Sequence, residues 1–541
     1  MKLIIGIDFD NTIACYDNVF CSVASTLGLI KNDEVLSKKD VKKSILSQSD
    51  GDVIWQKLQG QVYGKYMHCA SIFPGFIEFL RLCKVREHRV IIISHKTEYG
   101  HFDNEKISLR DVAMKWLQEN GLIEKNSLSL NRDEIYFEST RESKIKLIGE
   151  LGCDYFVDDL AEVLNDFSFP DEVKKILFSP VGGDGDTNNS WRKITKKILG
   201  DWSESEIISV TDKAFPKLYM KTAELISGRG NSRIYKLTGT NEDQYALKIY
   251  PDRQLDPRRR LETEFFTCQY FESSKLNVAK AKAKDLNLNW AIYSWISGKP
   301  IITPDKKFVD DAINFVEVLF RKSREIKDIS EFNEASEACL SGDEIIRQIH
   351  SRMDFLLMVD SEELTHYLEM EFLPIFKMIS EQASELPSNL FSEKISYDFL
   401  ILSPSDFGGH NAIRDKSNQT TFIDFEYFGW DDPVKLVSDF YWHPGMNLSS
   451  ELQEYWINST KNIFKNDVTF EPRLIAYLPL FALRWCLILL NEYLPDRPDK
   501  RMHTKNQCEE DVKSILSNQL KKSKTILNQV MKDIPNYGSA L

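Results

Sequence analysis

Paired cysteines, an excess of basic residues and a long uninterrupted apolar run are all missing from this sequence of 541 residues. The nine cysteines are scattered and form no CxxC pair, which excludes the usual zinc-binding and redox motifs. The formal net charge of -13 argues against wrapping a nucleic-acid backbone, because lysine and arginine supply that affinity. The apolar segment 474–490 contains Pro479 and Arg484, so a buried helix fits it better than a membrane span.

The N-terminus also lacks a secretory signal, because Asp8 and Asp10 directly follow the short apolar run Leu3–Ile7. We therefore expect a cytoplasmic protein with reduced thiols and no membrane attachment. The chain exceeds what one hydrophobic core usually spans, and its length suggests two to four domains. A hydrophobic fraction of 42% is ample for large cores.

The run Leu3–Ile7 is typical of a central parallel strand, and it ends at the motif Asp8-Phe9-Asp10-Asn11-Thr12. Open α/β sheets bind ligands at the carboxyl ends of their strands. Alternation along an extended chain sends Asp8 and Asp10 in the same direction. The two carboxylates can therefore share one Mg²⁺ and one phosphate site.

Three further pieces follow in order. Residues 89–93 form a second apolar strand that ends in Ser94, Lys144 opens a helical stretch, and residues 154–157 form a strand that ends in Asp158 and Asp159. Two alternatives stay open here. Lys146 competes with Lys144, and Asp159 has a purely structural reading as a helix N-cap.

This set of motifs resembles the haloacid dehalogenase (HAD) phosphatase superfamily over residues 1–200. The resemblance implies a Rossmann-like α/β domain with a small helical cap at about residues 14–75 and a domain boundary near 200–210. In that family the first Asp of DxDxT is the nucleophile that becomes a phospho-aspartate, and the second is the general acid and base. These roles imply Asp8 and Asp10 respectively, and both are expected near the metal.

The same resemblance assigns the remaining pieces. Ser94 would hold the phosphoryl oxygens, Lys144 would pair with their charge, and Asp158 with Asp159 would complete the Mg²⁺ shell. The chemistry is reasonable in itself, because a carboxylate attacking an anionic phosphate needs a metal and a lysine to neutralise the repulsion.

The second half contains a glycine loop, a strand with a lysine and a helix with a glutamate, in that order. Lys248 lies in the strand-like run 245–250, and Glu264 lies in the helix that follows, with Glu262 as a competing partner. The loop supplies small residues whose amides could approach nucleotide phosphates: Gly228, Gly230, Asn231 and Ser232. This order is that of a kinase small lobe, in which the lysine grips the phosphates.

Residues 290–298 are predicted to be a strand that enters a turn, where main-chain groups near Ser294 to Ile296 would meet adenine. Further along lies the stretch with Asp406 and, five residues later, Asn411, followed by Asp424 at the end of an apolar run. An Asp, an Asn and a second Asp combine a base with two Mg²⁺ ligands, which phosphoryl transfer requires. Asp406 would take the proton of the acceptor hydroxyl, while Asn411 and Asp424 would hold metal.

The second half resembles the aminoglycoside phosphotransferase and choline kinase family. The resemblance implies an α+β bilobal protein-kinase-like domain, with an N-lobe at 201–298, a C-lobe at 299–541, and ATP or GTP with Mg²⁺ as cofactors. The family usually carries His-Gly before the catalytic Asp, where this chain has Pro404-Ser405. That departure leaves a catalytically weak kinase half open.

The leading hypothesis is a bifunctional enzyme: an Mg²⁺-dependent phosphatase joined to a nucleotide-dependent kinase of a small hydroxylated metabolite, acting at different positions or on successive intermediates. The alternative is a phosphatase regulated by an inactive, nucleotide-binding kinase-like module. Nucleic-acid end repair also pairs these activities, but its kinases use a P-loop, and no GxxxxGK[ST] occurs here. The expected partners are a phosphate ester, a hydroxyl acceptor and a nucleotide, without nucleic acid or membrane.

Overall fold

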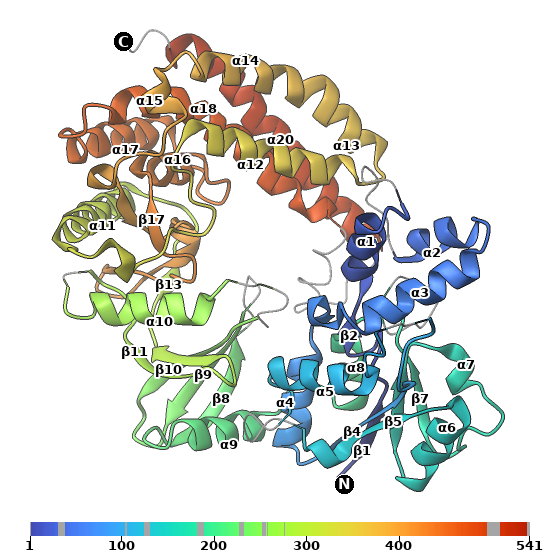
Figure 1. Cartoon of the computed structure of the whole chain (residues 1–541). Helices are drawn as coiled ribbons and strands as arrows, with labels where there is room; N and C mark the ends of the chain where they lie inside the picture. The colour runs from blue at the N-terminus through green and yellow to red at the C-terminus, as the bar shows by residue number, and fades with distance from the viewer. Residues whose placement is uncertain are drawn as a thin grey trace. The chain divides into compact units, whose positions relative to one another are not determined.

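The computed structural model divides the chain into two compact units (Figure 1). The first comprises Met1–Lys213 with Asp252–Pro257, and the second comprises Ala214–Pro251 with Arg258–Leu541. The structure describes residues 2–30, 38–102, 105–123, 130–180, 189–226, 232–251, 256, 258–274, 276–494 and 509–537.

The first unit is built on a parallel sheet of five strands in the order β5-β4-β1-β6-β7. The strands are β1 (Ile4–Ile7), β4 (Arg89–His95), β5 (Ile135–Glu138), β6 (Tyr155–Asp158) and β7 (Lys174–Leu177). The predicted strands at 3–7, 89–93 and 154–157 are confirmed, whereas β5 was not predicted. Because all five strands run in the same direction, their carboxyl ends meet at one edge.

Helices cover both faces of this sheet, which explains why the central strands β1 and β4 carry consecutive apolar residues. Along β4, Val90 and Ile92 pack into one core cluster, and Ile91 and Ile93 pack into another. The helices outside the cap are α4 (Phe76–Val85), α5 (Leu109–Glu119), α6 (Arg141–Glu150), α7 (Ala161–Leu164), α8 (Trp191–Ile198) and α9 (Glu204–Ala214). Helices α4, α5 and α8 pack on the first face, and α6 and α7 pack on the second.

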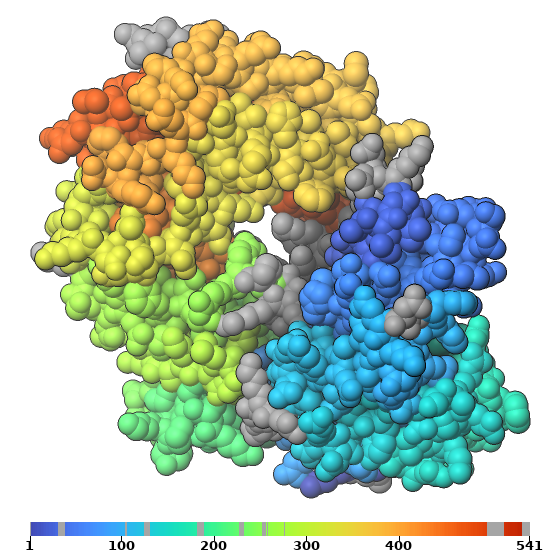
Figure 2. Space-filling view, viewed as in Figure 1, coloured from blue at the N-terminus to red at the C-terminus, as the bar shows by residue number. Residues whose placement is uncertain are grey.

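A helical insertion follows β1, as the sequence predicts for the cap. It contains α1 (Asp17–Thr26), α2 (Lys38–Leu46), α3 (Gly51–Tyr63) and the short η1 (Met67–Cys69), and the three α-helices pack against one another. A two-stranded ladder of β2 (Ala14–Cys15) and β3 (Ser71–Ile72) forms its base. In the space-filling view the insertion is the blue part of the surface of the first unit (Figure 2).

The second unit begins with an antiparallel sheet of five strands in the order β11-β12-β10-β9-β8. Its strands are β8 (Met220–Ile226), β9 (Arg233–Gly239), β10 (Gln244–Ile249), β11 (Ala281–Asp285) and β12 (Trp290–Ser294). Helix α10 (Arg260–Phe271) packs against β11 and β12. The sheet and α10 form a small lobe, and β10 carries the predicted lysine.

The rest of the second unit is a larger, mostly helical lobe. Its longer helices are α11 (Lys306–Glu325), α12 (Gly342–Leu357), α14 (Leu373–Ala383), α16 (Pro433–Trp442), α17 (Ser450–Ile463), α18 (Phe470–Leu489) and α20 (Glu509–Tyr537). Shorter helical segments are η3 (Ile329–Glu331), α13 (Glu362–His366), η4 (Tyr367–Phe372), α15 (Ser388–Phe391), η5 (Tyr397–Phe399), η6 (Gly409–Asn411) and η7 (Leu490–Tyr493). Short strands form two ladders: β13 (Lys299–Pro300) with β15 (Ala412–Arg414) and β16 (Thr420–Phe422), and β14 (Ile401–Ser403) with β17 (Gly429–Asp431).

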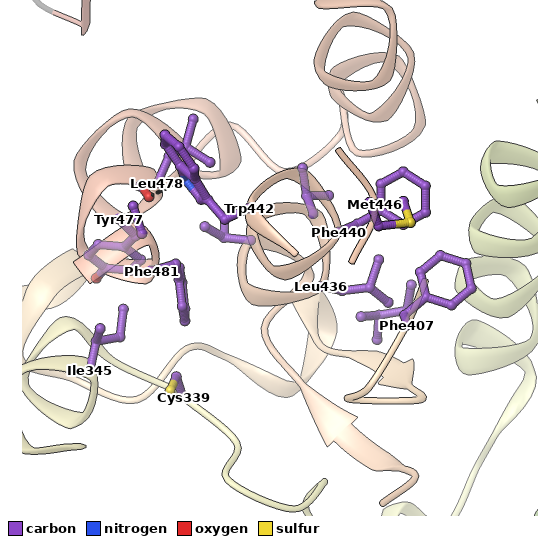
Figure 3. Close-up of a cluster of buried hydrophobic side chains, with 14 of the residues drawn as sticks. Cys339, Ile345, Phe407, Leu436, Phe440, Trp442, Met446, Tyr477, Leu478 and Phe481 are labelled. Carbon is purple, nitrogen blue, oxygen red and sulfur yellow. Dashed lines mark hydrogen bonds between the residues drawn. The ribbon is translucent and has the colours of Figure 1, made fainter. Parts of the chain in front are cut away.

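Helix α16 lies inside the apolar core of this lobe (Figure 3). Its Leu436 and Phe440 lie in the same buried cluster as Phe407, which belongs to the loop after β14. The Trp442 indole N–H donates to the carbonyl of Leu478 on α18 at 2.9 Å (Figure 3). The loop that carries Asp406 is therefore anchored in the core through its neighbour Phe407.

One described helical segment, Phe470–Tyr493, is long and apolar enough to cross a membrane by length and composition alone. Of its 18-residue apolar window, 72% is buried. The segment packs against α12, α14, α16 and α20, so it is a core helix within this unit. This agrees with the buried helix expected for residues 474–490.

Candidate active sites

The first candidate site lies at the carboxyl edge of the parallel sheet. Asp8 follows β1, Asp158 ends β6, and the Lys144 ammonium lies 2.6 Å from a carboxylate oxygen of each. Lys144 lies in the first turn of α6, whose N-cap Thr140 forms a capping box with Ser143. Parallel pairing of β1 and β6 brings the two aspartates together.

The competing lysine lies elsewhere. Lys146 is largely exposed and pairs with Glu150 along the same helix at 3.5 Å, whereas Lys144 is 1% exposed. Ser94 is buried near the end of β4, on the strand that adjoins β1. The structure therefore brings Asp8, Ser94, Lys144 and Asp158 to one edge of the sheet, as the sequence predicts.

Three carboxylates crowd this edge and make it suited to a cation. Ligand oxygens of Asp8, Asp158 and Asp159 lie within 4.8 Å of one another. Burial raises the pKa of Asp8 to about 7, with Asp158 adding to the rise and Lys144 opposing it. Burial, with Asp8 and Asp158, raises the pKa of Asp159 to about 8. Hard oxygen ligands with uncompensated negative charge fit Mg²⁺.

Asp159 is not a helix N-cap here, because Leu160 holds the N-cap position of α7 and its amide bonds to Asp158 at 2.8 Å. The structural alternative for Asp159 is therefore wrong.

Asp10 lies beside this group in a different environment. Its carboxylate accepts hydrogen bonds from the Lys96 ammonium at 2.7 Å and from the Tyr16 hydroxyl at 2.5 Å. Lys96 is 3% exposed, and its ammonium also lies over the ring of Phe9. Because the Asp10 carboxylate faces a cation, its predicted role as a side-chain metal ligand gains no support from these contacts.

Lys96 was not identified from the sequence, although a signal was present. Lys96 lies two residues beyond Ser94, and the alternation that relates Asp8 to Asp10 applies to this pair as well. The loop after Asp10 is held by Trp191 of α8, whose indole N–H donates to the Thr12 carbonyl at 2.8 Å. The cap contributes Lys38, whose ammonium bonds to the Asn11 side chain.

The second candidate site is centred on Lys248 of β10. Its ammonium lies 2.7 Å from Glu264 of α10, 2.6 Å from Asp424 and 3.1 Å from Glu426. The Tyr250 hydroxyl also donates to Glu264 at 2.7 Å and orients it. Glu262 pairs instead with Arg259.

The contact of Glu426 with Lys248 was not predicted from the sequence. Glu426 is held from its other side by Arg260 of α10, at 2.6 Å. The Lys248 ammonium therefore faces three carboxylates, and one of them, that of Glu426, also pairs with Arg260. Burial raises the pKa of Asp424 to about 7, with Glu426 and Glu264 adding to the rise and Lys248 opposing it. This excess of negative charge again fits a divalent cation, with Asp424 as the central ligand.

Asp406 and Asn411 lie in the same unit, on the loop between β14 and β15. The Asn411 side-chain amide donates to the Asp406 carbonyl at 3.0 Å, and the Asn411 carbonyl accepts from Ile423, next to Asp424, at 2.9 Å. These bonds bring the base loop beside the metal-binding segment. With its nitrogen engaged, Asn411 has its side-chain oxygen to offer a cation.

The Asp406 carboxylate accepts from the His410 imidazole at 3.0 Å. Burial by itself raises the pKa of Asp406, but the hydrogen bond and electrostatic attraction of His410, with a smaller effect of His443, outweigh it and hold this pKa below its usual value. Asp406 is therefore ionised at neutral pH and able to accept a proton. His410 was not predicted to take part.

One of the main-chain groups predicted to contact adenine is already hydrogen-bonded within the second unit. The Ser294 amide donates to the Lys280 carbonyl at 2.8 Å, so it is not available to a nucleotide in this conformation. This corrects the expectation for that amide, while the Ile296 main chain stays a prediction. Ser232 lies just before β9, and Gly228, Gly230 and Asn231 lie outside the described residues.

We expect Mg²⁺ to bind the first site more tightly at pH 8 than at pH 6. The pKa values of Asp8 and Asp159, at about 7 and about 8, mean that the metal must displace protons at the lower pH. Without metal, the folded carboxyl groups keep protons that the unfolded chain has released. The free energy of unfolding should therefore fall as the pH rises from about 4 to about 8.

Thermal unfolding of the full chain with and without Mg²⁺ at both pH values tests this. The Mg²⁺-induced rise in Tm should be larger at pH 8. Asp159→Asn should reduce that difference because it removes a carboxyl group with a raised pKa, but should not abolish it, because Asp424 of the second unit is unchanged. Asp171→Asn, at an exposed position, is the matched control. An equal Mg²⁺ effect at both pH values would contradict the expected linkage.

Comparisons with protein-family models and with curated proteins found no match to this chain. Among solved structures, the chain is similar to an ethanolamine kinase of Plasmodium vivax at 13% identity and a TM-score of 0.41, with 65% of this chain and 95% of that chain covered. It is also similar to a spectinomycin phosphotransferase in complex with ADP and spectinomycin, at 10% identity and a TM-score of 0.42, covering 60% and 98% of the two chains.

A third similar structure is a choline kinase from Cryptosporidium parvum, at 13% identity and a TM-score of 0.38, covering 60% of this chain and 96% of that chain. The likeness is loose at these identities and TM-scores, so the roles of individual residues follow from their own contacts.

Proposed function

We propose that this chain is a bifunctional enzyme that transfers phosphate from ATP or GTP to a small hydroxylated metabolite in its second unit and removes phosphate from an ester in its first. The two activities act at different positions or on successive intermediates, because a kinase and a phosphatase acting on one position would only consume nucleotide. The expected metabolite is a sugar, a polyol or an amino alcohol. We further propose that both reactions take place in the cytoplasm.

The kinase proposal is carried by the contact of Lys248 with both Glu264 and Asp424. A lysine held by a helix glutamate can grip nucleotide phosphates, and bound Mg²⁺ would neutralise charge on the phosphates next to Asp424 and Asn411. Asp406 would accept the proton of the acceptor hydroxyl as that oxygen attacks the terminal phosphate. Its ionised state fits this role.

The phosphatase proposal rests on the geometry of the first site alone, since the similar structures named above are kinases. Asp8 would attack the phosphorus of the ester, and Lys144, 2.6 Å from Asp8, would pair with the phosphoryl oxygens. Asp10 would transfer a proton to the leaving oxygen and then take one from the attacking water. Mg²⁺ at Asp8, Asp158 and Asp159 would supply the charge neutralisation that this attack needs.

A mass-resolved screen tests both halves together. Intact protein with Mg²⁺ and ATP or GTP is incubated with sugar phosphates, polyol phosphates, amino alcohols and their unphosphorylated forms. We expect phosphate gain on one compound and phosphate loss on another. If ATP only altered the rate of phosphate loss and no compound gained phosphate, the second unit would instead be a regulatory nucleotide-binding module.

We expect Lys248→Met to lower kcat/KM for ATP by about 100-fold, because the variant loses the cation that faces the nucleotide phosphates. Glu264→Gln should give a smaller loss in the same direction, because it frees Lys248 from one of its partners. Glu262→Gln is the matched control on the same helix, and its value should stay near that of the wild type. Steady-state kinetics with ATP as the varied substrate measures all three, and equal losses in the two glutamate variants would contradict the assignment of Glu264.

A further inference from the structure

The side chain of Asp406 is the start of a chain of contacts that runs through three aromatic rings. The His410 ring, bonded to Asp406, stacks on His443 with centroids 4.3 Å apart and an interplanar angle of 8°. The rings of His443 and Trp485 form a T-shaped pair with centroids 4.8 Å apart. The Trp485 indole N–H donates to Asp439 of α16 at 2.9 Å. The orientation of the carboxylate is thus linked to a core helix.

The backbone of Asp406 is linked to the same helix from the other side. Ser405 adopts a left-handed conformation with φ of 65°, which is costly for a residue with a side chain and needs support from its surroundings. Its hydroxyl donates to the Ser336 carbonyl at 2.8 Å and accepts from the Lys435 ammonium at 3.3 Å. Lys435 belongs to α16, so both routes from Asp406 end on that helix.

Lys435 joins the two routes. It is 1% exposed, and its ammonium lies 3.0 Å from Asp431 and 3.2 Å from Asp439. The contacts therefore form a closed circuit that starts and ends at Asp406. We call this circuit of residues the Asp406 ring; its members in order are Asp406, His410, His443, Trp485, Asp439, Lys435 and Ser405. Helix α16 is itself buried in the apolar core (Figure 3), so the ring is built on a rigid element.

A buried lysine between two aspartates is a poor way to gain stability, because the desolvation of three charges offsets most of their attraction. Such a network is well suited to holding one geometry, since each charged group has specific partners. The base of a phosphoryl transfer needs that precision, because a displacement of about 1 Å can cost roughly 100-fold in rate.

A metal site is the alternative reading, because ligand atoms of Asp406, His410 and His443 lie within 4.8 Å of one another. The ring geometry argues against it. An imidazole binds a cation along the lone pair in its own plane, and two nearly parallel rings 4.3 Å apart cannot both point that lone pair at one ion. Stacking instead lets His443 set the orientation of His410.

We propose that His410 and Lys435 are positioning residues for phosphate transfer: His410 orients the Asp406 carboxylate, and Lys435 holds the strained Ser405 backbone that carries it. This inference rests on the proposed kinase function. Neither His410 nor Lys435 is the base or a metal ligand of the sequence motif. Their contacts explain how Asp406 can be held in place although Pro404-Ser405 precedes it instead of the family's usual His-Gly.

The test compares His410→Ala, His410→Gln, His443→Ala and His443→Phe in the full-length protein. Hydrolysis of Mg²⁺·ATP with water as acceptor is one readout, and transfer to an acceptor found by the screen is the other. His410→Ala should lower kcat by up to roughly 100-fold, with KM for ATP changed by no more than about twofold. His410→Gln should recover most of the loss because its amide can donate in place of Nε2, and His443→Phe should be milder than His443→Ala because it keeps the stack.

Lys435→Met tests whether Lys435 holds the Ser405 backbone, and Lys394→Met, at an exposed lysine, is the control. It should lower kcat in the same way; if it fails to fold, the histidine series decides. A His410→Ala kcat within about twofold of the wild type, or no recovery in His410→Gln, would overturn the proposal. So would activation by added Zn²⁺ that is lost in His410→Ala. If the wild type neither hydrolyses ATP nor transfers phosphate, the kinase function fails and the positioning role falls with it.

Discussion

Asp406→Asn should lower ATP-dependent phosphate transfer by about 1000-fold, the largest effect that we expect in the second unit. The amide that replaces the carboxylate cannot take the proton of the acceptor hydroxyl, although its shape and its hydrogen bond with His410 can be kept. Binding of Mg²⁺·ATP should persist, because Lys248, Glu264 and Asp424 are unchanged. The loss should therefore be in kcat, measured by product mass at saturating ATP.

Asp398→Asn is the matched control for this change, because Asp398 is exposed on the same lobe and uses only its main-chain carbonyl to bond Arg324. Its transfer rate should equal that of the wild type. Should Asp406→Asn keep more than about a tenth of the wild-type kcat, Asp406 would not be the base.

Asp8→Asn should abolish phosphate release from the ester substrate, with a loss on the order of 1000-fold or more, because no other described group replaces the attacking oxygen. The fold should survive. Lys144 keeps its bond to Asp158, and the raised pKa of Asp8 indicates that its charge is costly in the folded state. Measurement of released phosphate, with Tm as the check on folding, tests both statements.

The same pair of proteins tests the covalent step. A rapid acid quench during turnover should trap phosphorylated wild-type protein in an intact-mass spectrum and no such species in Asp8→Asn, with Asp171→Asn behaving as the wild type. The two active-site variants should also be independent: Asp8→Asn leaves phosphate transfer intact, and Asp406→Asn leaves phosphate release intact. Loss of both activities in either single variant would mean that the chain has one site and not two.

Local patterns in the sequence were sufficient for much of the framework. Strands buried on both faces are continuous apolar runs, so β1, β4 and β6 could be located, and polar residues at their carboxyl ends had to meet at one edge. The choice of Lys144 over Lys146 and of Glu264 over Glu262 also rested on local reasoning, from helix position and apolar periodicity. In the structure the chosen residues face the candidate sites and their competitors do not.

Other parts of the sites had no local signature. Strand β5 is a short edge strand whose four residues are all half-buried, and its apolar run of three residues, Ile135 to Phe137, is too short to mark a strand by itself. Glu426 and His410 are ordinary polar residues in sequence, and only the folded chain shows that each contacts a predicted site residue. A charged residue has no periodicity of its own that distinguishes a partner in a site from a solvated side chain.

The sequence by itself determined the central strands of this protein and the chemistry of its predicted reactive groups, because apolar runs mark buried strands, and residue type sets what a side chain can bind. Only the tertiary structure decided which groups act on one another. The bond between Lys144 and Asp8 spans 136 residues, and the Asp406 ring joins Ser405 to Lys435 and His410 to His443 through a buried helix. Such contacts depend on how whole elements pack, and no local pattern specifies that packing.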